Sequence, residues 1–202
     1  MEQLLNFVEE CVNTFHSYYN YGKTERMLVY CRPAVEKFIF NKIYGVLYDM
    51  YNNKFAEDNN KFMAKIEQIK LLGPEKIMEF LEVRSKFKGI SMDRKYIPYK
   101  STIDCINKIE LEINPKDKFD SLMKASLEMR NFVLEITNGK GILNALDDEL
   151  PLFIYCTTQV AIKNIFAELR MIEDYLQYST SIDKESKVLI TLQVSYYRYL
   201  IY

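Results

Sequence analysis

The sequence predicts an all-α protein, and three observations support this fold class. Apolar residues recur at steps of three or four through nearly every segment, as on the buried face of an amphipathic helix. No segment sustains the strict alternation of apolar and polar residues that marks a half-buried strand. The chain of 202 residues is 49% hydrophobic and 27% charged, so it has enough apolar surface for one substantial core or two small subdomains.

The first two expected helices are separated by Tyr21-Gly22. We expect the second to carry Pro33 in its first turn, where proline is favoured, and to run to about Tyr51. We expect most aromatic and methionine residues on the helical stripes to be core, and His16 to be structural. The stripes of these two helices are Leu4, Val8, Cys11, Phe15 and Tyr18, then Val35, Phe38, Ile39, Lys42, Ile43, Val46 and Leu47.

Two further helices complete the first half of the chain. Asp58 is the expected cap of the third, and Gly73-Pro74 ends it and begins the fourth. The helical pattern then lapses from Lys88 to Pro98, which predicts a loop. We therefore expect an N-terminal helical bundle over residues 1–98, packed on core helices over residues 99–202.

The second half shows the same helical period. A short helix is expected from Ser101 to a stop at Asn114-Pro115, followed by one that carries Phe119 to Met129. Asn138-Gly139-Lys140-Gly141 is the clearest linker in the chain. Later helices are expected from about Asp147, Asn164 and Asp183.

Composition excludes several classes of function. The formal net charge is -1 with no basic stripe, so we expect no nucleic-acid partner. His16 is the only histidine, and the four cysteines are widely spaced, so we expect reduced thiols, no metal site and no histidine-dependent triad. No signal peptide is evident, and the most apolar stretch, 150–162, is too short to span a bilayer. These features favour a soluble cytoplasmic protein without a cofactor.

The most informative stretch is Asp147-Asp148-Glu149-Leu150-Pro151, which joins a loop to an apolar helix. Taken alone, it predicts that one aspartate caps the helix and that both interact favourably with its dipole. Pro151 is then expected in the first turn, where its missing N–H costs little.

Several motifs, in the same order and spacing, resemble the vacuolar-protein-sorting-nine domain family, whose members include Rabex, the Rin proteins and alsin. The resemblance covers residues 33–202. Its pieces are Val35–Tyr44, Pro115-Lys116-Asp117-Lys118-Phe119, Asp147–Tyr155 with its Asp-x-x-x-Pro spacing, Asn164–Leu169, Ile172–Leu176 and Thr191-Leu192-Gln193.

The resemblance implies a helical protein that promotes GDP release from a small GTPase of the early-endosomal Rab-five subfamily. It implies that Asp147, four residues before Pro151, enters the nucleotide site, with Asp148 as the neighbouring candidate. No covalent chemistry or cofactor is implied. The protein would be cytoplasmic and would reach early endosomes as a peripheral protein.

A second family element on the last helix departs from the family pattern. Lys187 stands where an aromatic is common and Ile190 where a threonine is common, beside Thr191. The resemblance implies that these residues form a GTPase-binding surface together with Asp148 and Pro151. The departure keeps two alternatives open: a Rab-binding adaptor without exchange activity, or a helical scaffold in which the aspartates only stabilise a helix.

Overall fold

A computed structural model describes residues 1–19, 25–89, 96–143 and 146–179. No strand occurs in these ranges, so the predicted all-α class is confirmed. The described helices are α1 (Glu2–Tyr19), α2 (Glu25–Lys54), α3 (Ala56–Lys70), α4 (Pro74–Phe80), η1 (Ser85–Phe87), α5 (Lys100–Asn107), η2 (Lys108–Glu110), α6 (Pro115–Ile136), α7 (Leu146–Gln159) and α8 (Ile165–Tyr178). The expected helix from Asp183 lies outside the described residues.

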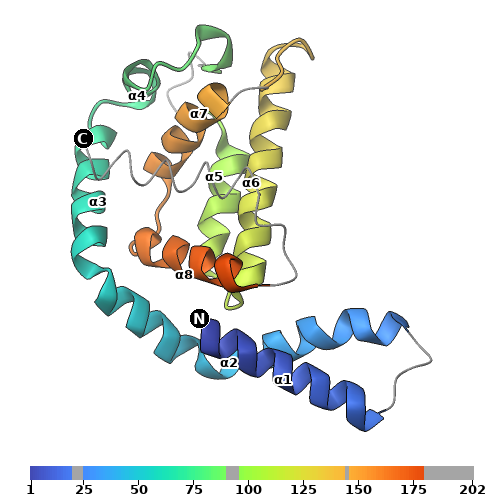
Figure 1. Ribbon diagram of the computed structural model, residues 1–202. Helices are drawn as coiled ribbons and strands as arrows, with labels where there is room; N and C mark the ends of the chain where they lie inside the picture. The colour runs from blue at the N-terminus through green and yellow to red at the C-terminus, as the bar shows by residue number, and fades with distance from the viewer. Residues whose placement is uncertain (20–24, 90–95, 144–145, 180–202) are drawn as a thin grey trace.

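The helices are arranged around a central group formed by α5, α6 and α7 (Figure 1). Helix α8 crosses below this group and contacts α1, α2, α3 and α6. Helix α2 packs beside α1 at the lower end and then continues into α3, which rises along one side toward α4. Helices α3 and α4 both contact α7, so the first half of the chain packs directly onto the second.

Helix α2 begins earlier than the sequence predicts. It starts at Glu25, so Pro33 lies inside the helix and not in its first turn. Proline removes one helical hydrogen bond and crowds the carbonyl four residues earlier, here that of Val29. Both residues face solvent, and Val29 is 69% exposed, so water can satisfy that carbonyl.

Helix α3 also begins before its expected cap. Its first residue is Ala56, so Asp58 lies in the first turn and does not cap the helix. The residue before the helix is Phe55, whose N–H donates to the carbonyl of Tyr51 at 3.0 Å, while its own carbonyl accepts from the N–H of Asn59 at 2.8 Å. Because the hydrogen-bond ladder of α2 continues across this junction, no side-chain cap is required.

Asn114-Pro115 is a helix boundary, but it begins α6 and does not end the helix expected from Ser101, which ends at Asn107 and is followed by the short η2 to Glu110. The Asn114 side chain accepts a hydrogen bond from the N–H of Lys116 at 2.9 Å, and Pro115 occupies the first helical position. The predicted linker begins where α6 ends: Asn138 has φ 52°, and the N–H of Gly139 donates to the carbonyl of Leu134 at 2.7 Å. Both ends of α6 thus follow from local sequence signals.

The core lies where α5–α8 meet the inner faces of α2–α4. Aromatic pairs join the two halves: Phe40 of α2 packs edge-on against Tyr175 of α8, with ring centroids 6.1 Å apart, and Phe55 contacts Phe166 at 5.9 Å. The Tyr175 hydroxyl also donates to a carboxylate oxygen of Glu36 at 2.9 Å. These contacts stabilise the packing of α2 against α8.

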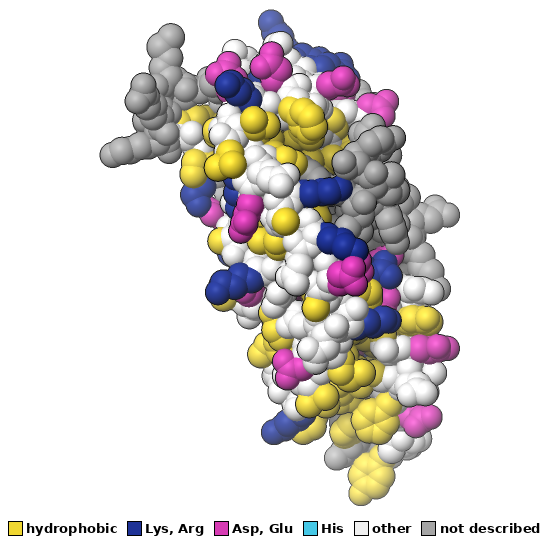
Figure 2. Space-filling view, turned by 90° about the vertical axis from the view of Figure 1, so that its left-hand side faces the viewer, with side chains coloured by type: hydrophobic (Ala, Val, Ile, Leu, Met, Phe, Trp, Pro, Cys, Tyr) yellow, Lys and Arg dark blue, Asp and Glu magenta, His cyan; other side chains and the backbone are white. Residues whose placement is uncertain are grey.

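Several residues expected in the core are exposed. Phe15, Tyr18, Phe38 and Val46 are 46%, 78%, 66% and 67% exposed. The buried residues in the described parts of α1 and α2 include two positions of the expected stripes, Val8 and Leu47, and otherwise lie at Leu5, Val12, Glu36, Phe40 and Tyr51. Hydrophobic side chains therefore appear at the lower end of the molecule in Figure 2, level with α1 and α2 in Figure 1.

Candidate functional site

The acids that the sequence singles out lie in the first turn of α7. This helix begins at Leu146, so neither Asp147 nor Asp148 is the residue that precedes it, and the expectation that one of them caps it is wrong. Pro151 lies inside the helix, beyond the first turn where it was expected. Its missing N–H leaves the carbonyl of Asp147 without its helical partner, close enough to the helix start to be tolerated.

The three consecutive acids of this turn have different surroundings. Asp147 is exposed, and among the described residues its carboxylate has no ion-pair partner. The Asp148 side chain is 7% exposed and forms an ion pair with Arg84, which follows α4. The Glu149 side chain is 4% exposed, and one of its oxygens lies 3.0 Å from Nη2 and 3.2 Å from Nε of Arg130, on α6.

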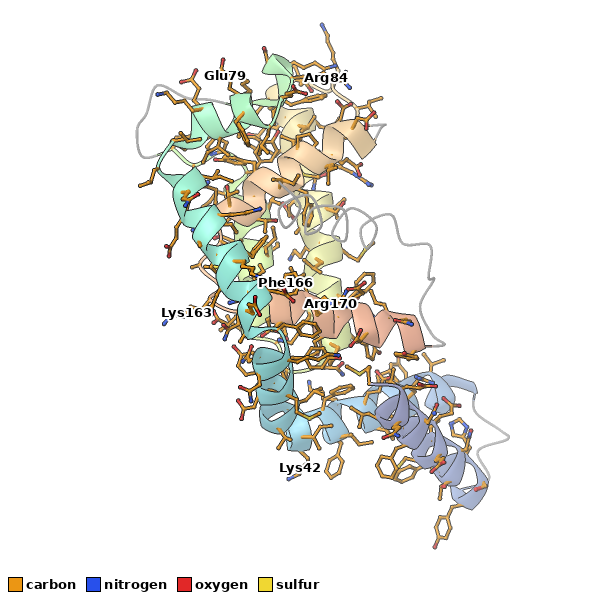
Figure 3. All side chains as sticks on the ribbon, turned by 60° about the vertical axis from the view of Figure 1, so that its left-hand side comes forward. Lys42, Glu79, Arg84, Lys163, Phe166 and Arg170 are labelled. Atoms are coloured by element: carbon orange, nitrogen blue, oxygen red, sulfur yellow. The ribbon has the colours of Figure 1, made fainter. Side chains whose placement is uncertain are left out.

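This arrangement leaves Asp147 as the one exposed carboxylate of the three. Figure 3 shows Arg84 at the upper end of the molecule, on the segment that follows α4 and lies over the beginning of α7. A first-turn acid interacts favourably with the positive end of the helix dipole. The site can therefore present a negative charge on a rigid helix end.

Helix α7 is a rigid support because it is buried on nearly all sides. From Leu152 to Thr158 every residue is buried, and the helix contacts α3, α4 and α5. The ring of Tyr155 packs edge-on against that of Tyr99, with centroids 6.2 Å apart. Burial also raises the pKa of the Tyr155 hydroxyl and of the Cys156 thiol, so both stay protonated near neutral pH.

A buried ion pair joins the helices below the site. Lys118 of α6 and Glu168 of α8 have side chains that are 0% exposed, with Nζ 2.9 Å from Oε2. The Lys118 ammonium holds Oε2, while Oε1 accepts from the Tyr44 hydroxyl at 3.2 Å. The Lys118 ammonium also donates to the carbonyl of Ile109 at 2.6 Å and to the Tyr44 oxygen at 3.0 Å.

The pKa values of this pair shift in the directions that burial imposes. Desolvation lowers the pKa of Lys118 and raises the pKa of Glu168, and the attraction between the two charges opposes both shifts. In the sequence, Lys118 stands out only as part of the Pro115–Phe119 motif. A glutamate inside an otherwise apolar run, such as Glu168, was the available signal that a buried cation was needed.

Lys187, Ile190 and Thr191 lie outside the described residues. That they sit beside Asp147, Asp148 and Pro151 stays a prediction. In the ranges that the structure describes, no group of histidine, cysteine and acidic side chains could hold a metal ion. No described helix is both long enough and apolar enough to cross a membrane.

Comparison with known proteins identifies the class of protein that this fold and site represent. Residues 99–200, half of the chain, match the model of the vacuolar sorting protein 9 (VPS9) domain. The chain therefore belongs to the VPS9 domain family, as its motifs predict.

Two relatives show the breadth of the similarity. The chain is 24% identical to the ALS2 C-terminal-like protein of Mus musculus over 148 residues, which is 68% of this chain and 15% of that protein. It is 24% identical to alsin of Homo sapiens over 133 residues, which is 60% of this chain and 8% of that protein. The chain thus spans only a small part of the length of these curated relatives.

Proposed function

We propose that this chain is a guanine-nucleotide exchange factor for a Rab GTPase of the early-endosomal Rab-five subfamily. Membership of the VPS9 domain family supports the class of activity. The observation that carries the proposal is the exposed Asp147 at the start of a buried helix, which has no ion-pair partner among the described residues and lies beside two acids whose charges are already compensated. The protein would act in the cytoplasm and peripherally on early endosomes.

An exposed carboxylate suits this task for electrostatic reasons. A GTPase holds GDP through a P-loop lysine, backbone N–H groups and Mg²⁺, all of which attract the phosphates. Picomolar nucleotide affinity corresponds to about 16 kcal/mol, so spontaneous release is slow. The Asp147 carboxylate would pair with the lysine, repel the β-phosphate and weaken Mg²⁺ binding.

This mechanism requires no covalent step. Binding of the exchange factor and binding of the nucleotide oppose one another through a coupling free energy, which is reciprocal. The carboxylate also compensates the lysine once phosphate has left, which stabilises the nucleotide-free GTPase. Pro151, Asp148 and the segment with Lys187, Ile190 and Thr191 would complete the contact surface.

We also propose different roles for the two parts of the chain. The core over residues 99–202 would contact the GTPase, and this range begins where the family match begins. The helices over residues 1–98 would support it, because α3 and α4 pack against α7 and α2 packs against α8.

The test is the release of fluorescent GDP from a panel of endosomal Rab proteins. Asp147→Ala should remove most of the acceleration. Its stability cost should be small, about 0.5 kcal/mol, because an exposed first-turn acid contributes only a dipole interaction. Asp117, in the first turn of α6, provides the matched control: Asp117→Ala loses a similar interaction and should release GDP at the parent rate.

Two outcomes would favour the alternatives. If Asp147→Ala releases GDP at the parent rate, the aspartate only stabilises α7, and the result favours the helical scaffold. If the parent binds a Rab but accelerates release from none, the chain is a binding adaptor, as the departures at Lys187 and Ile190 would then explain.

A further inference from the structure

The segment that follows α4 is held in a defined turn. The N–H of Val83 donates to the carbonyl of Met78 at 2.9 Å, and the N–H of Glu82 donates to that of Glu79 at 3.0 Å. These two bonds form a Schellman turn, in which Glu82 has the left-handed φ of 57° that usually favours glycine. Val83 and Met78 are buried at 6% and 0% exposure and belong to the same hydrophobic core, as is typical of this turn.

Arg84, which directly follows this turn, contacts both an aromatic ring and an acid. The guanidinium carbon lies 5.6 Å from the centroid of the Phe87 ring, and Phe87 is only 1% exposed. Nη2 of the same group forms the ion pair with Asp148. Arginine suits both contacts at once because its planar group stacks on rings and pairs with carboxylates.

We infer that Arg84 is a positioning residue for exchange: by neutralising Asp148, it leaves Asp147 as the acid that the first turn of α7 presents. The inference rests on the function proposed above. Without Arg84, a carboxylate in a 7% exposed site would lose its counter-charge beside a second carboxylate. The first turn would then shift to bring Asp148 toward water, and Asp147 would move with it.

The inference also gives the first half of the chain a role in the site. Arg84 precedes residues 99–200, the range that matches the family model. The charge that selects between the two aspartates therefore comes from a segment outside that range. Residues before the matched domain would set the geometry of exchange as well as support the fold.

The test measures GDP release from a responsive Rab at increasing concentrations of the protein, so that kcat and KM are separated. Arg84→Ala should lower kcat about tenfold or more, because small misplacements of a reacting group have effects of this size. KM should change less than twofold, since Arg84 acts through Asp147. The double variant Arg84→Ala/Asp148→Asn should regain most of the kcat that Arg84→Ala loses, because a neutral amide needs no counter-charge.

Arg130→Ala is the matched control. Arg130 is 44% exposed against 54% for Arg84, and it pairs with Glu149, which does not adjoin Asp147 in the chain. We expect this variant to keep the parent kcat. An equal fall in kcat for both arginine variants, or no recovery in the double variant, would show that Arg84 only anchors α7 and would overturn the inference.

Two further outcomes separate this inference from the function on which it rests. A rise in KM at unchanged kcat for Arg84→Ala would mean that Arg84 contacts the GTPase itself, and the positioning role would be rejected while exchange stands. A parent protein that accelerates release from no Rab overturns the proposed function and the inference together.

Discussion

Helices α2 and α8 both carry apolar residues at helical spacing, yet they use them differently. Helix α8 is buried on nearly every side, from Ile165 to Leu169 and again at Met171, Ile172, Tyr175 and Leu176. Helix α2 buries one narrow line, formed in its described part by Glu36, Phe40, Leu47 and Tyr51, while Phe38 and Val46 face solvent. Helix α8 contacts several other helices, α1, α2, α3 and α6, whereas the main contacts of α2 are with α1 and α8.

The difference shows what hydrophobic periodicity can and cannot predict. Spacing indicates that a segment is a helix, since the period of 3.6 residues is a property of the backbone. Depth of burial depends on how many other helices surround that segment. The number of neighbouring helices cannot be predicted from the sequence of the segment alone. The same limit applies to charges, because Lys118 and Lys116 lie in one turn of α6 with side chains that are 0% and 38% exposed.

The largest effect is expected from breaking the ion pair in the core. Lys118→Met leaves the carboxylate of Glu168 buried without its counter-charge, which should lower the free energy of unfolding by about 3–5 kcal/mol. The same change at Lys116, whose partner Asp120 is itself half exposed, should alter it by no more than about 0.5 kcal/mol. Urea unfolding of both variants provides the measurement.

A double variant sharpens this prediction. Lys118→Met/Glu168→Leu removes both charges and should regain most of the lost stability, because an apolar pair fills the site without a desolvation penalty. Equal losses for Lys118→Met and Lys116→Met would contradict the buried position of Lys118.

A smaller effect is expected within α2, where two phenylalanines lie two residues apart. Phe40→Ala should lower the free energy of unfolding by about 3 kcal/mol, because Phe40 is 0% exposed and the change leaves a cavity against Tyr175. Phe38→Ala should cost about 0.5 kcal/mol or less, since Phe38 is 66% exposed and the Lys42 ammonium lies as far as 5.8 Å from the ring centroid. Similar midpoints in urea would mean that the buried line of α2 is wrongly placed.

The features predicted correctly from the sequence depend on local chemistry. Asn114-Pro115, Gly73-Pro74 and Asn138-Gly139 each mark a helix boundary because the backbone geometry there favours those residue types. The start of α2 was missed because nothing local excludes a proline within a helix whose outer face is solvated. In the same way, α3 needs no cap because α2 continues into it.

The candidate site also has some features that depend on local sequence and others that depend on distant contacts. The position of Asp147 and Asp148 at the start of a buried helix followed from the pattern Asp-Asp-Glu-Leu-Pro. Which of the two acids stays exposed did not follow, because the answer depends on Arg84 and Arg130, which approach from other helices. Adjacent residues of the same type are chemically equivalent in a sequence and become distinct only through such distant contacts.

The smallest expected effect compares a helix cap that the sequence predicts with one that the structure shows. Asn114→Ala removes the acceptor for the N–H of Lys116, so that donor is left unsatisfied in a position where Asn114 itself is only 6% exposed. The free energy of unfolding should fall by about 1 kcal/mol, and Asn114→Ser, which keeps an acceptor, should restore most of it. Asp58→Ala should cost clearly less, about 0.3 kcal/mol, because Asp58 lies in the first turn of α3, where it interacts favourably with the helix dipole but does not cap the helix. Thermal unfolding of the three variants at one pH and salt concentration separates these values.

A loss at Asp58 as large as that at Asn114 would show that α3 starts as an independent helix with its own cap, and that α2 does not continue into it.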